Sequence, residues 1–192
     1  MPASATNLIA GPATLWTGAF GATEPADTAV ATDITAPFTD VGGTDDGVTL
    51  TVSREFFKLR MDQTVDAPGR RMTERDITIA TNFAEGTLAN FAMAMGQASS
   101  TVTTGGTAGT AFAAMDVVGD DAGAEPTYLS VILRGRAPNG KARSVFARKC
   151  LSTEEVEMAY KKDDQTLIPV TFALHWVSPS VRPMRIVDST AA

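Results

Sequence analysis

The segment from Gly47 to Gly96 most constrains the fold, because it reads as two long strands joined by a charged turn and followed directly by a helix. In its first part Val48, Leu50 and Val52 alternate with polar residues, which is the period-2 pattern of a half-buried strand. A second strand pattern returns after the turn. The segment therefore predicts a long hairpin over about 48–80.

The apolar pattern of the first strand changes face beyond Arg54. The residues that follow divide into Phe57, Leu59 and Met61 on one parity and Phe56, Lys58 and Arg60 on the other. Because a one-residue slip moves every side chain to the opposite face, the change predicts a bulge near Arg54 or an outer half that serves a different surface. We expect both together.

A polar turn closes the hairpin between Arg60 and Arg71. Its turn-forming residues are Asp62, Gln63, Asp66, Pro68 and Gly69. The return strand is expected over about 72–81, with Ile77 and Ile79 on one parity. A small domain cannot bury the outer half of so long a hairpin, and its exposed aromatic residues would promote aggregation unless another subunit covered them. Segment 54–71 is therefore predicted to protrude.

A single helix is expected over about 83–95. Asn82 is the expected N-cap, Glu85 stands where a capping box needs it, and Gly96 is placed to end the helix. The apolar stripe of this helix is formed by Leu88, Phe91, Ala92 and Met95.

The second half of the chain has β patterns throughout. Asn139 and Gly140 separate segments 127–137 and 142–151, and Asn-Gly between two strand patterns is a strong hairpin signal. As a two-residue turn it would place Leu129 opposite Cys150, Leu133 opposite Phe146, and Arg136 opposite Arg143. Directly opposed like charges destabilise a ladder. The basic residues here are therefore expected either to form a solvated basic face or to meet acidic residues of another subunit; they are Arg134, Arg136, Arg143 and Lys149.

Further strands are expected near both ends of the chain. Residues 14–18 form a strand pattern with Leu15 and Trp16 as anchors, after an extended arm over 1–13. Residues 166–177 alternate strictly, and the apolar face consists of Ile168, Val170, Phe172, Leu174 and Trp176. Pro169 requires an early or edge position in that strand. A last short strand is expected at 184–187, and 97–126 is expected to be a polar loop region or a short strand connection.

Composition limits the classes of function. A chain of 192 residues with 44% hydrophobic residues is expected to form one domain over 1–192. Its net charge of -6 argues against DNA binding, which needs clustered lysine and arginine. The N-terminus lacks the pattern of a signal peptide, and the uncharged stretch 86–115 is too polar to span a membrane. A soluble chain is expected.

No pattern of catalytic or metal-binding residues stands out. The single histidine, His175, lies in a strand pattern, and the single cysteine, Cys150, ends another, which argues against a triad and a disulfide framework. Segment 116–125 is acidic but lacks the ligand order of a calcium loop. The Gly-rich stretch in 97–110 has no Gly-Lys-Ser/Thr sequence for a phosphate. We therefore expect no enzyme, metal or cofactor.

The order of these features resembles the major tail tube protein of long-tailed, siphophage-type bacteriophages. The resemblance rests on 48–60, on 61–70 with Asp62-Gln63 and Pro68, on 73–81 and on 82–96, and it is looser over 126–187. It implies a mainly β, sandwich or barrel-like fold with one flanking helix. It further implies six-membered rings that stack into a hollow tube, with each subunit's strands joined into one inner barrel.

The resemblance also implies where subunits would meet. The hairpin tip matches the loop that reaches the neighbouring ring, and the N-terminal arm would be a second inter-ring contact. The candidate stacking residues are Leu8, Ile9, Trp16, Phe56, Phe57, Arg60, Met61, Asp62, Gln63, Val65, Asp66, Pro68 and Arg70. Arg134, Arg136 and Arg143 are the candidates for contacts within a ring. Tape measure, terminator and distal tail proteins would be further partners.

A tube that conducts DNA should repel it. Its lining should be acidic or neutral, so that DNA slides without binding. Glu55, Glu74 and Asp76 lie on polar strand faces suited to this role. The implied location is the virion tail, assembled in the cytoplasm of the host.

Two other structural functions remain open on the sequence alone. One is the tube of a contractile injection system, which is physically similar but delivers protein. The other is a β-sandwich adhesion or receptor-binding module, which would need a concave aromatic site.

Overall fold

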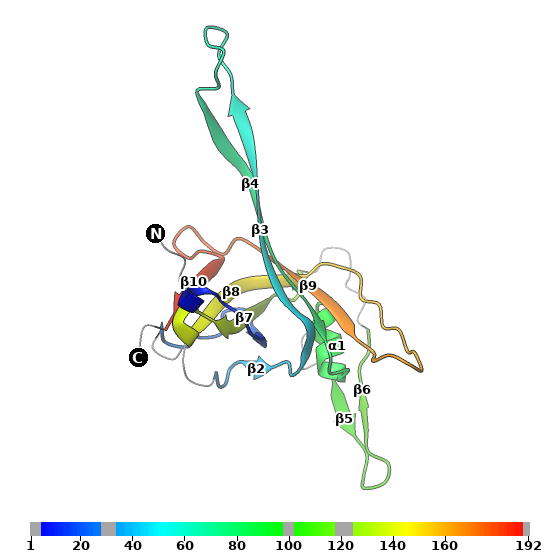
Figure 1. Ribbon diagram of the computed structural model, residues 1–192. Helices are drawn as coiled ribbons and strands as arrows, with labels where there is room; N and C mark the ends of the chain where they lie inside the picture. Colours follow the sequence, from blue (N-terminus) through cyan, green and yellow to red (C-terminus); the bar gives the residue numbers. More distant parts are fainter. Residues whose placement is uncertain (1–4, 28–33, 98–101, 118–124, 190–192) are drawn as a thin grey trace.

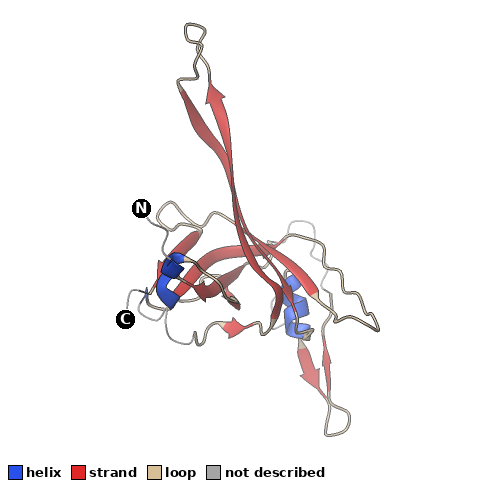
Figure 2. Cartoon of the chain, in the orientation of Figure 1, coloured by secondary structure: helices blue, strands red, loops and turns tan. Residues whose placement is uncertain are grey.

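The computed structural model describes residues 5–27, 34–97, 102–117 and 125–189. The chain is mainly β, with a large antiparallel sheet folded into a sandwich-like body and one α-helix packed against it (Figures 1 and 2). This confirms the expected fold class. The strands of the large sheet are β1 Thr14–Ala19, β2 Thr39–Asp40, β3 Thr44–Leu59, β4 Gly69–Phe83, β7 Leu129–Arg136, β8 Ala142–Ser152, β9 Ile168–Leu174 and β10 Met184–Asp188.

The sheet runs in the order β2-β1-β7-β8-β9-β4-β3, and β10 pairs with β8. β9 and β10 share one side of β8: β10 pairs with Arg143–Ala147, and β9 pairs with Cys150–Ser152. One long strand therefore serves two partners along the same edge. The ends of the order are the two-residue β2 and the sixteen-residue β3.

The central strands bury both of their faces. The main core cluster takes Leu15, Val131 and Val145 from one face of β1, β7 and β8. The other face of these strands contributes Trp16, Ile132 and Phe146 to a second cluster, which also contains Phe38 from the segment before β2. Strand segments buried on both faces read as continuous apolar runs, which explains the unbroken burial of residues 129–133.

The base of the long hairpin is tied into the main core. Ile79 and Phe83 of β4 are fully buried, and so are Ile168 and Phe172 of β9, which lies beside it. The rings of Phe83 and Phe172 pack in a tilted arrangement with centroids 6.4 Å apart. Burying a side chain of this size stabilises the fold by about 1.5–3 kcal/mol. The core thus fixes one end of β4 and leaves the other end outside the body.

The helix begins later than the sequence predicts. β4 continues to Phe83, and Asn82 is paired in the ladder with Asp45, so the expected N-cap at Asn82 and the helix start near 83 are wrong. The α-helix α1 spans Leu88–Ala94, and its N-cap is Thr87, whose hydroxyl accepts a hydrogen bond from the Asn90 amide at 3.2 Å. Pairing with β3 on one side and β9 on the other holds residues 82–83 in the sheet.

The buried stripe of α1 also differs from the prediction. Its buried residues are Asn90, Ala92, Met93 and Ala94, whereas Leu88 is exposed. The polar side chain of Asn90 can be buried because its side-chain amide donates hydrogen bonds to the carbonyl oxygens of Val41 at 2.8 Å and Glu85 at 3.0 Å. Gly96 ends the helix as expected, with a φ of 72° that favours glycine.

The turn between β7 and β8 is longer than the predicted two residues. Residues Pro138–Gly140 form a single 3-10 turn, and the Ala137 amide donates to the Lys141 carbonyl oxygen at 2.7 Å. The extra residue shifts the register, so Arg143 lies opposite Gly135 rather than Arg136, and Phe146 lies opposite Ile132 rather than Leu133. The predicted pairing of Leu129 with Cys150 is confirmed, because an irregularity between Leu129 and Val131 restores it.

Three smaller predictions have mixed outcomes. The strand at 14–18 and the last strand at 184–187 are confirmed as β1 and β10. Pro169 is the second residue of β9, as an early position requires, although β9 lies inside the sheet between β8 and β4. Trp176 is 68% exposed and follows the end of β9, so its assignment to that apolar face is wrong.

The polar region at 97–126 contains a separate two-stranded sheet. Strands β5 Thr103–Gly105 and β6 Phe112–Ala114 pair with each other and extend away from the body on the side opposite the long hairpin (Figure 1). The rest of the region is loop where it is described.

The structure predicts that matched phenylalanine substitutions in the core and on the hairpin have different effects. Phe172→Ala removes a side chain with 0% exposure and should lower the free energy of unfolding by about 3–5 kcal/mol. Phe57→Ala removes a side chain that is 61% exposed and should change it by less than about 0.5 kcal/mol. Urea unfolding of the dispersed subunit measures both. Equal losses of stability would contradict this view of the core.

Candidate assembly surfaces

The β3–β4 hairpin continues as an ordered ladder far outside the body. Its register runs from Thr44 opposite Phe83 to Leu59 opposite Gly69. The connection is therefore 60–68 rather than the expected 60–71, and the ladder is longer than predicted. The outer part leaves the body at one end and carries the tip with it (Figure 1). At about 3.3 Å per residue, the exposed stretch from Val52 to Leu59 reaches roughly 25 Å.

The predicted bulge lies near Arg54, but the extra residue is on the other strand. Glu55 pairs with Glu74 and the next residue, Phe56, pairs with Met72, which leaves Thr73 of β4 without a partner on β3. β3 therefore keeps its alternation through this point. Apolar side chains occur on both faces here because neither face has a core to cover.

The outer strand pairs bring the predicted acidic residues together. Directly opposed residues share one face of an antiparallel pair. Glu55 lies opposite Glu74, and Asp76 lies opposite Ser53, so all three carboxylates stand on the same side of the hairpin. This polar face turns away from the side that buries Ile79. It consists of Thr49, Thr51, Ser53 and Glu55 of β3 with Glu74, Asp76, Thr78 and Ala80 of β4.

The polar face continues onto β9, which the sequence did not indicate. Thr171 lies opposite Ala80, and its hydroxyl donates to the Glu154 carboxylate at 3.0 Å. Glu154 thereby joins the polar face from a loop that follows β8. Its position depends on β9 lying beside β4, a long-range pairing that no local pattern contains.

The outer stem is the part of the ladder formed by residues 52–59 and 69–77, and its other face is basic. Arg54 lies opposite Arg75, and Lys58 lies opposite Arg70. Within the described residues, none of the observed ion pairs involves these four side chains. Opposed like charges destabilise a ladder by tenths of a kcal/mol or more. The stem therefore opposes acidic side chains on one face and basic side chains on the other, and none of the ion pairs observed in the described part of the chain joins them to an opposite charge.

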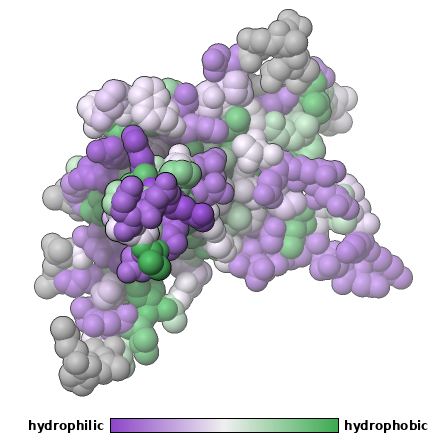
Figure 3. All heavy atoms as spheres, turned by 90° about the horizontal axis from the view of Figure 1, so that it is seen from above, coloured by the Kyte–Doolittle hydropathy of each residue, from purple (hydrophilic) through white to green (hydrophobic). Residues whose placement is uncertain are grey.

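The tip carries exposed apolar side chains between its charges. Val65 at the apex is fully exposed, and Met61 is 49% exposed. Further down the stem the exposed large apolar residues are Val52, Phe56, Phe57, Leu59 and Met72. Seen from above, the surface is mainly hydrophilic with smaller apolar areas between (Figure 3). These apolar side chains make the hairpin a candidate interaction surface.

The arm has two parts with different burial. Leu8 is 80% exposed and Ile9 is 48% exposed, after a short 3-10 helix at Ala5–Asn7. Trp16, in contrast, is 9% exposed and packs in the second core cluster. Of the three arm residues considered for stacking, the structure thus leaves Leu8 and Ile9 accessible and uses Trp16 inside the subunit.

The arginine cluster of the second half does not act as one group. Arg143 forms a two-pronged ion pair with Asp188 of β10, at 2.6 and 2.8 Å. The hydrogen bond from Arg143 lowers the pKa of the Asp188 carboxyl, an effect that exceeds the opposing effect of burial. Arg136 lies against Gly11 of the arm. Arg148, which was not among the predicted residues, pairs with Glu24 instead.

The two candidates for reactive side chains lie in structural positions. Cys150 is fully buried, and burial raises the pKa of its thiol to about 12. His175 packs edge-on against Tyr128, with ring centroids 5.6 Å apart. No group of three or more His, Cys, Asp or Glu side chains in the described part of the chain is placed to hold a metal. Residues 118–124 of the acidic segment lie outside the described residues.

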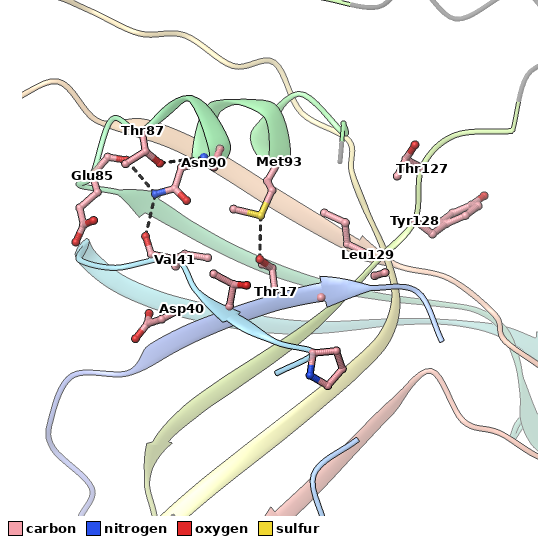
Figure 4. A pocket seen from close by; sticks show the side chains of 15 residues that line it. Thr17, Asp40, Val41, Glu85, Thr87, Asn90, Met93, Thr127, Tyr128 and Leu129 are labelled. Carbon is pink, nitrogen blue, oxygen red and sulfur yellow. Dashed lines mark hydrogen bonds between the residues drawn. The ribbon is translucent and has the colours of Figure 1, made fainter. Parts of the chain in front are cut away.

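A pocket of about 470 Å³ opens between α1 and the edge of the sheet. Its apolar base includes Val41, Met93 and Leu129, and its rim includes Asp40 and Glu85 (Figure 4). The Thr17 hydroxyl donates to the Met93 sulfur at 2.9 Å, and the side-chain amide of Asn90 donates to the Val41 carbonyl oxygen. These two hydrogen bonds connect α1 to β1 and to the segment that follows β2.

Comparison with known families identifies the chain. A family model described as phage tail tube protein matches residues 2–178. The chain belongs to this family. No curated protein sequence matches it.

Membership explains the exposed hairpin in general terms. A tail tube protein is a structural virion component that self-assembles and meets other tail proteins, and the family is not a class of enzymes. None of the helices in the described residues has the length and apolar content for a membrane crossing.

The structure predicts that a single charge change strengthens the hairpin of this tail tube protein. Glu74→Lys converts the repulsion from Glu55 into attraction, which should slow amide hydrogen exchange in the stem of the dispersed subunit by up to about fivefold. Glu157→Lys makes the same charge change in an exposed loop and serves as the control. Unchanged or faster exchange in the stem of Glu74→Lys would contradict the repulsion.

Proposed function

We propose that this tail tube protein forms six-membered rings that stack into the hollow tube of a long-tailed, siphophage-type tail, through which DNA passes. The observation that carries the proposal is the β3–β4 hairpin, an ordered element with apolar side chains and like-charge pairs that its own subunit does not cover. Such an element needs a neighbour. Assembly would take place in the host cytoplasm, with tape measure, terminator and distal tail proteins as further partners.

The free edge of β3 supports ring formation. β3 is the last strand of the sheet and pairs only with β4 among the described residues. A long, unpaired strand edge favours pairing with another chain. Repeating one head-to-tail contact closes a ring and removes every such edge. In this arrangement the β3 edges of all subunits join a common inner barrel.

The polar face supports a lumen lining. It lies on the side of β3 and β4 away from the core, so in an inner barrel it would turn toward the central channel. Its charged residues Glu55, Glu74, Asp76 and Glu154 are all acidic. Repeated around a ring, these carboxylates would repel the phosphates of DNA and keep it from binding. The basic face, with Arg54 and Arg75, would then turn toward other subunits.

Stacking would use the hairpin tip and the arm. The candidates on the hairpin are Phe56, Phe57, Arg60, Met61, Asp62, Gln63, Val65, Asp66, Pro68 and Arg70, and those on the arm are Leu8 and Ile9. Arg134, Arg136 and Arg143 remain candidates for contacts within a ring, with Arg143 already held by Asp188.

Shortening the hairpin should block stacking without unfolding the subunit. Replacing residues 60–68 by Asn-Gly joins the paired residues Leu59 and Gly69 through a favourable two-residue turn and removes the apex. Electron microscopy should show single rings or dispersed subunits in place of tubes. The control is the same replacement of residues 161–164 in an exposed loop, which should still give tubes. Normal tubes from the hairpin variant would rule out the hairpin as the stacking element.

Reversing the charge of the polar face should make tubes retain DNA. The variant Glu55→Lys/Glu74→Lys/Asp76→Lys places lysines where DNA would pass, and its retention of short duplex DNA in co-sedimentation should weaken steeply as salt rises. Unmodified tubes should retain almost none. The control, Glu157→Lys/Asp163→Lys/Asp164→Lys, has the same net charge change in an exposed loop. Equal retention by both variants would contradict the lumen assignment.

A further inference from the structure

The pocket between α1 and the sheet edge lies at the end of the subunit opposite the hairpin tip. In Figure 1 the hairpin leaves one end of the body, while α1 and β2, which form much of the pocket, lie toward the other end. An open stack repeats one heterologous contact, in which an element at one end meets a receiving surface at the other end of the next copy. The pocket is placed to be that surface.

The pocket and the tip have complementary chemistry. The rim of the pocket carries the carboxylates of Asp40 and Glu85, both exposed, and its lining residues include no lysine or arginine. The segment 58–71 carries four basic and two acidic side chains, with Met61 and Val65 exposed between them. Four basic and two acidic side chains give this segment a net charge of +2, with Asp62 and Asp66 between Arg60 and Arg70, and this charge is opposite in sign to that of the rim.

The rim carboxylates are fixed in position by the chain around them. Asp40 accepts a hydrogen bond from the Gly42 amide and Glu85 accepts one from the Gly43 amide, both at 2.9 Å. Glu85 lies so close over Gly42 that a Cβ there would overlap its carboxylate. Each carboxylate keeps further acceptor capacity for a guanidinium. Because both carboxylates are already ordered, they would lose less conformational entropy on binding a partner's arginine.

We propose that this pocket receives the hairpin tip of a second copy of the chain, with Met61 and Val65 in the hollow and Arg60 and Arg70 at the rim. The inference rests on the proposed stacking and adds the receiving site. Two other segments with exposed apolar side chains, 5–13 and 102–115, fit less well because they contain no charged residue to pair with the rim. The contact joins the apex of one subunit to α1, β1 and β2 of the next.

Disulfide trapping in assembled tubes tests the contact. Val65→Cys combined with Ala89→Cys places one thiol at the apex and one in the pocket, and oxidation should give a ladder of covalently linked subunits on a non-reducing gel. Thr39→Cys offers a second pocket position in case Ala89→Cys disturbs α1. The native Cys150 is buried, with the pKa of its thiol raised to about 12, so it should contribute little background.

Matched cysteine pairs distinguish the segments that could occupy the pocket. Leu8→Cys with Ala89→Cys tests the arm in the same pocket, and Val65→Cys with Tyr160→Cys tests an exposed position outside it. A ladder from the Val65 pairs with Ala89 or Thr39, and not from these controls, supports the proposal. Tubes that give no such ladder, or give it only with Leu8, overturn the proposal and leave tube formation intact. Absence of rings and tubes from the unmodified chain would overturn both.

Charge removal at the rim gives an independent readout. Asp40→Asn/Glu85→Gln keeps oxygen acceptors for the glycine amides and removes both charges. It should raise the concentration needed for tube growth by roughly two- to fivefold for each lost charge pair, and added salt should reduce the difference from the unmodified chain. Asp163→Asn/Asp164→Asn is the control. Equal growth of the rim variant and this control would overturn the proposed role of the carboxylates.

Discussion

The ladder between β3 and β4 is the constraint on which the rest of the structure depends. Strand pairing extends from Phe83 in the core to Gly69 near the tip, and only two local register shifts interrupt it. Near the core, β9 supports the ladder from the side and buries Ile79 and Phe172. Farther out, the ladder has only its own hydrogen bonds. The same two strands therefore belong to the core at one end and form the exposed outer stem at the other.

This arrangement divides a single element into a packed part and an exposed part. Packing energy is concentrated in the body, where both faces of β7 and β8 are covered. The outer stem instead opposes like charges, as in Arg54 with Arg75 and Glu55 with Glu74. Such pairs weaken an isolated ladder. In the proposed tube the two hairpin faces would meet different surroundings, and natural proteins accept local conflicts of this kind at functional sites.

Local patterns predicted much of the fold. The hairpin, the position of its tip, the strands at 14–18 and 184–187 and the end of the helix at Gly96 were all readable, because alternation and turn-forming residues act within a few positions. The start of the helix was not predicted correctly from the local pattern. Asn82 has the composition of an N-cap, but pairing with Asp45 and Pro169 keeps it in the sheet, so tertiary contacts override the local preference. The Pro-Asn-Gly turn has one residue more than predicted, which moves the opposed pairs by one position from Arg136 back to Val131, and the irregularity beyond Val131 restores the predicted pair of Leu129 with Cys150.

The sequence by itself determined that this chain is an acidic, mainly β protein with one hairpin too long for its own body, and it identified the charged and apolar residues on that hairpin. Only the tertiary structure decided which of them act together. Glu154 joins the polar face because β9 lies beside β4, and the pocket exists because Asn90 and Thr17 hold α1 against the sheet edge. These relations join residues that are far apart in the chain. Side-chain periodicity reports which face a residue takes on its own strand, whereas neighbours across strands are set by pairing and packing.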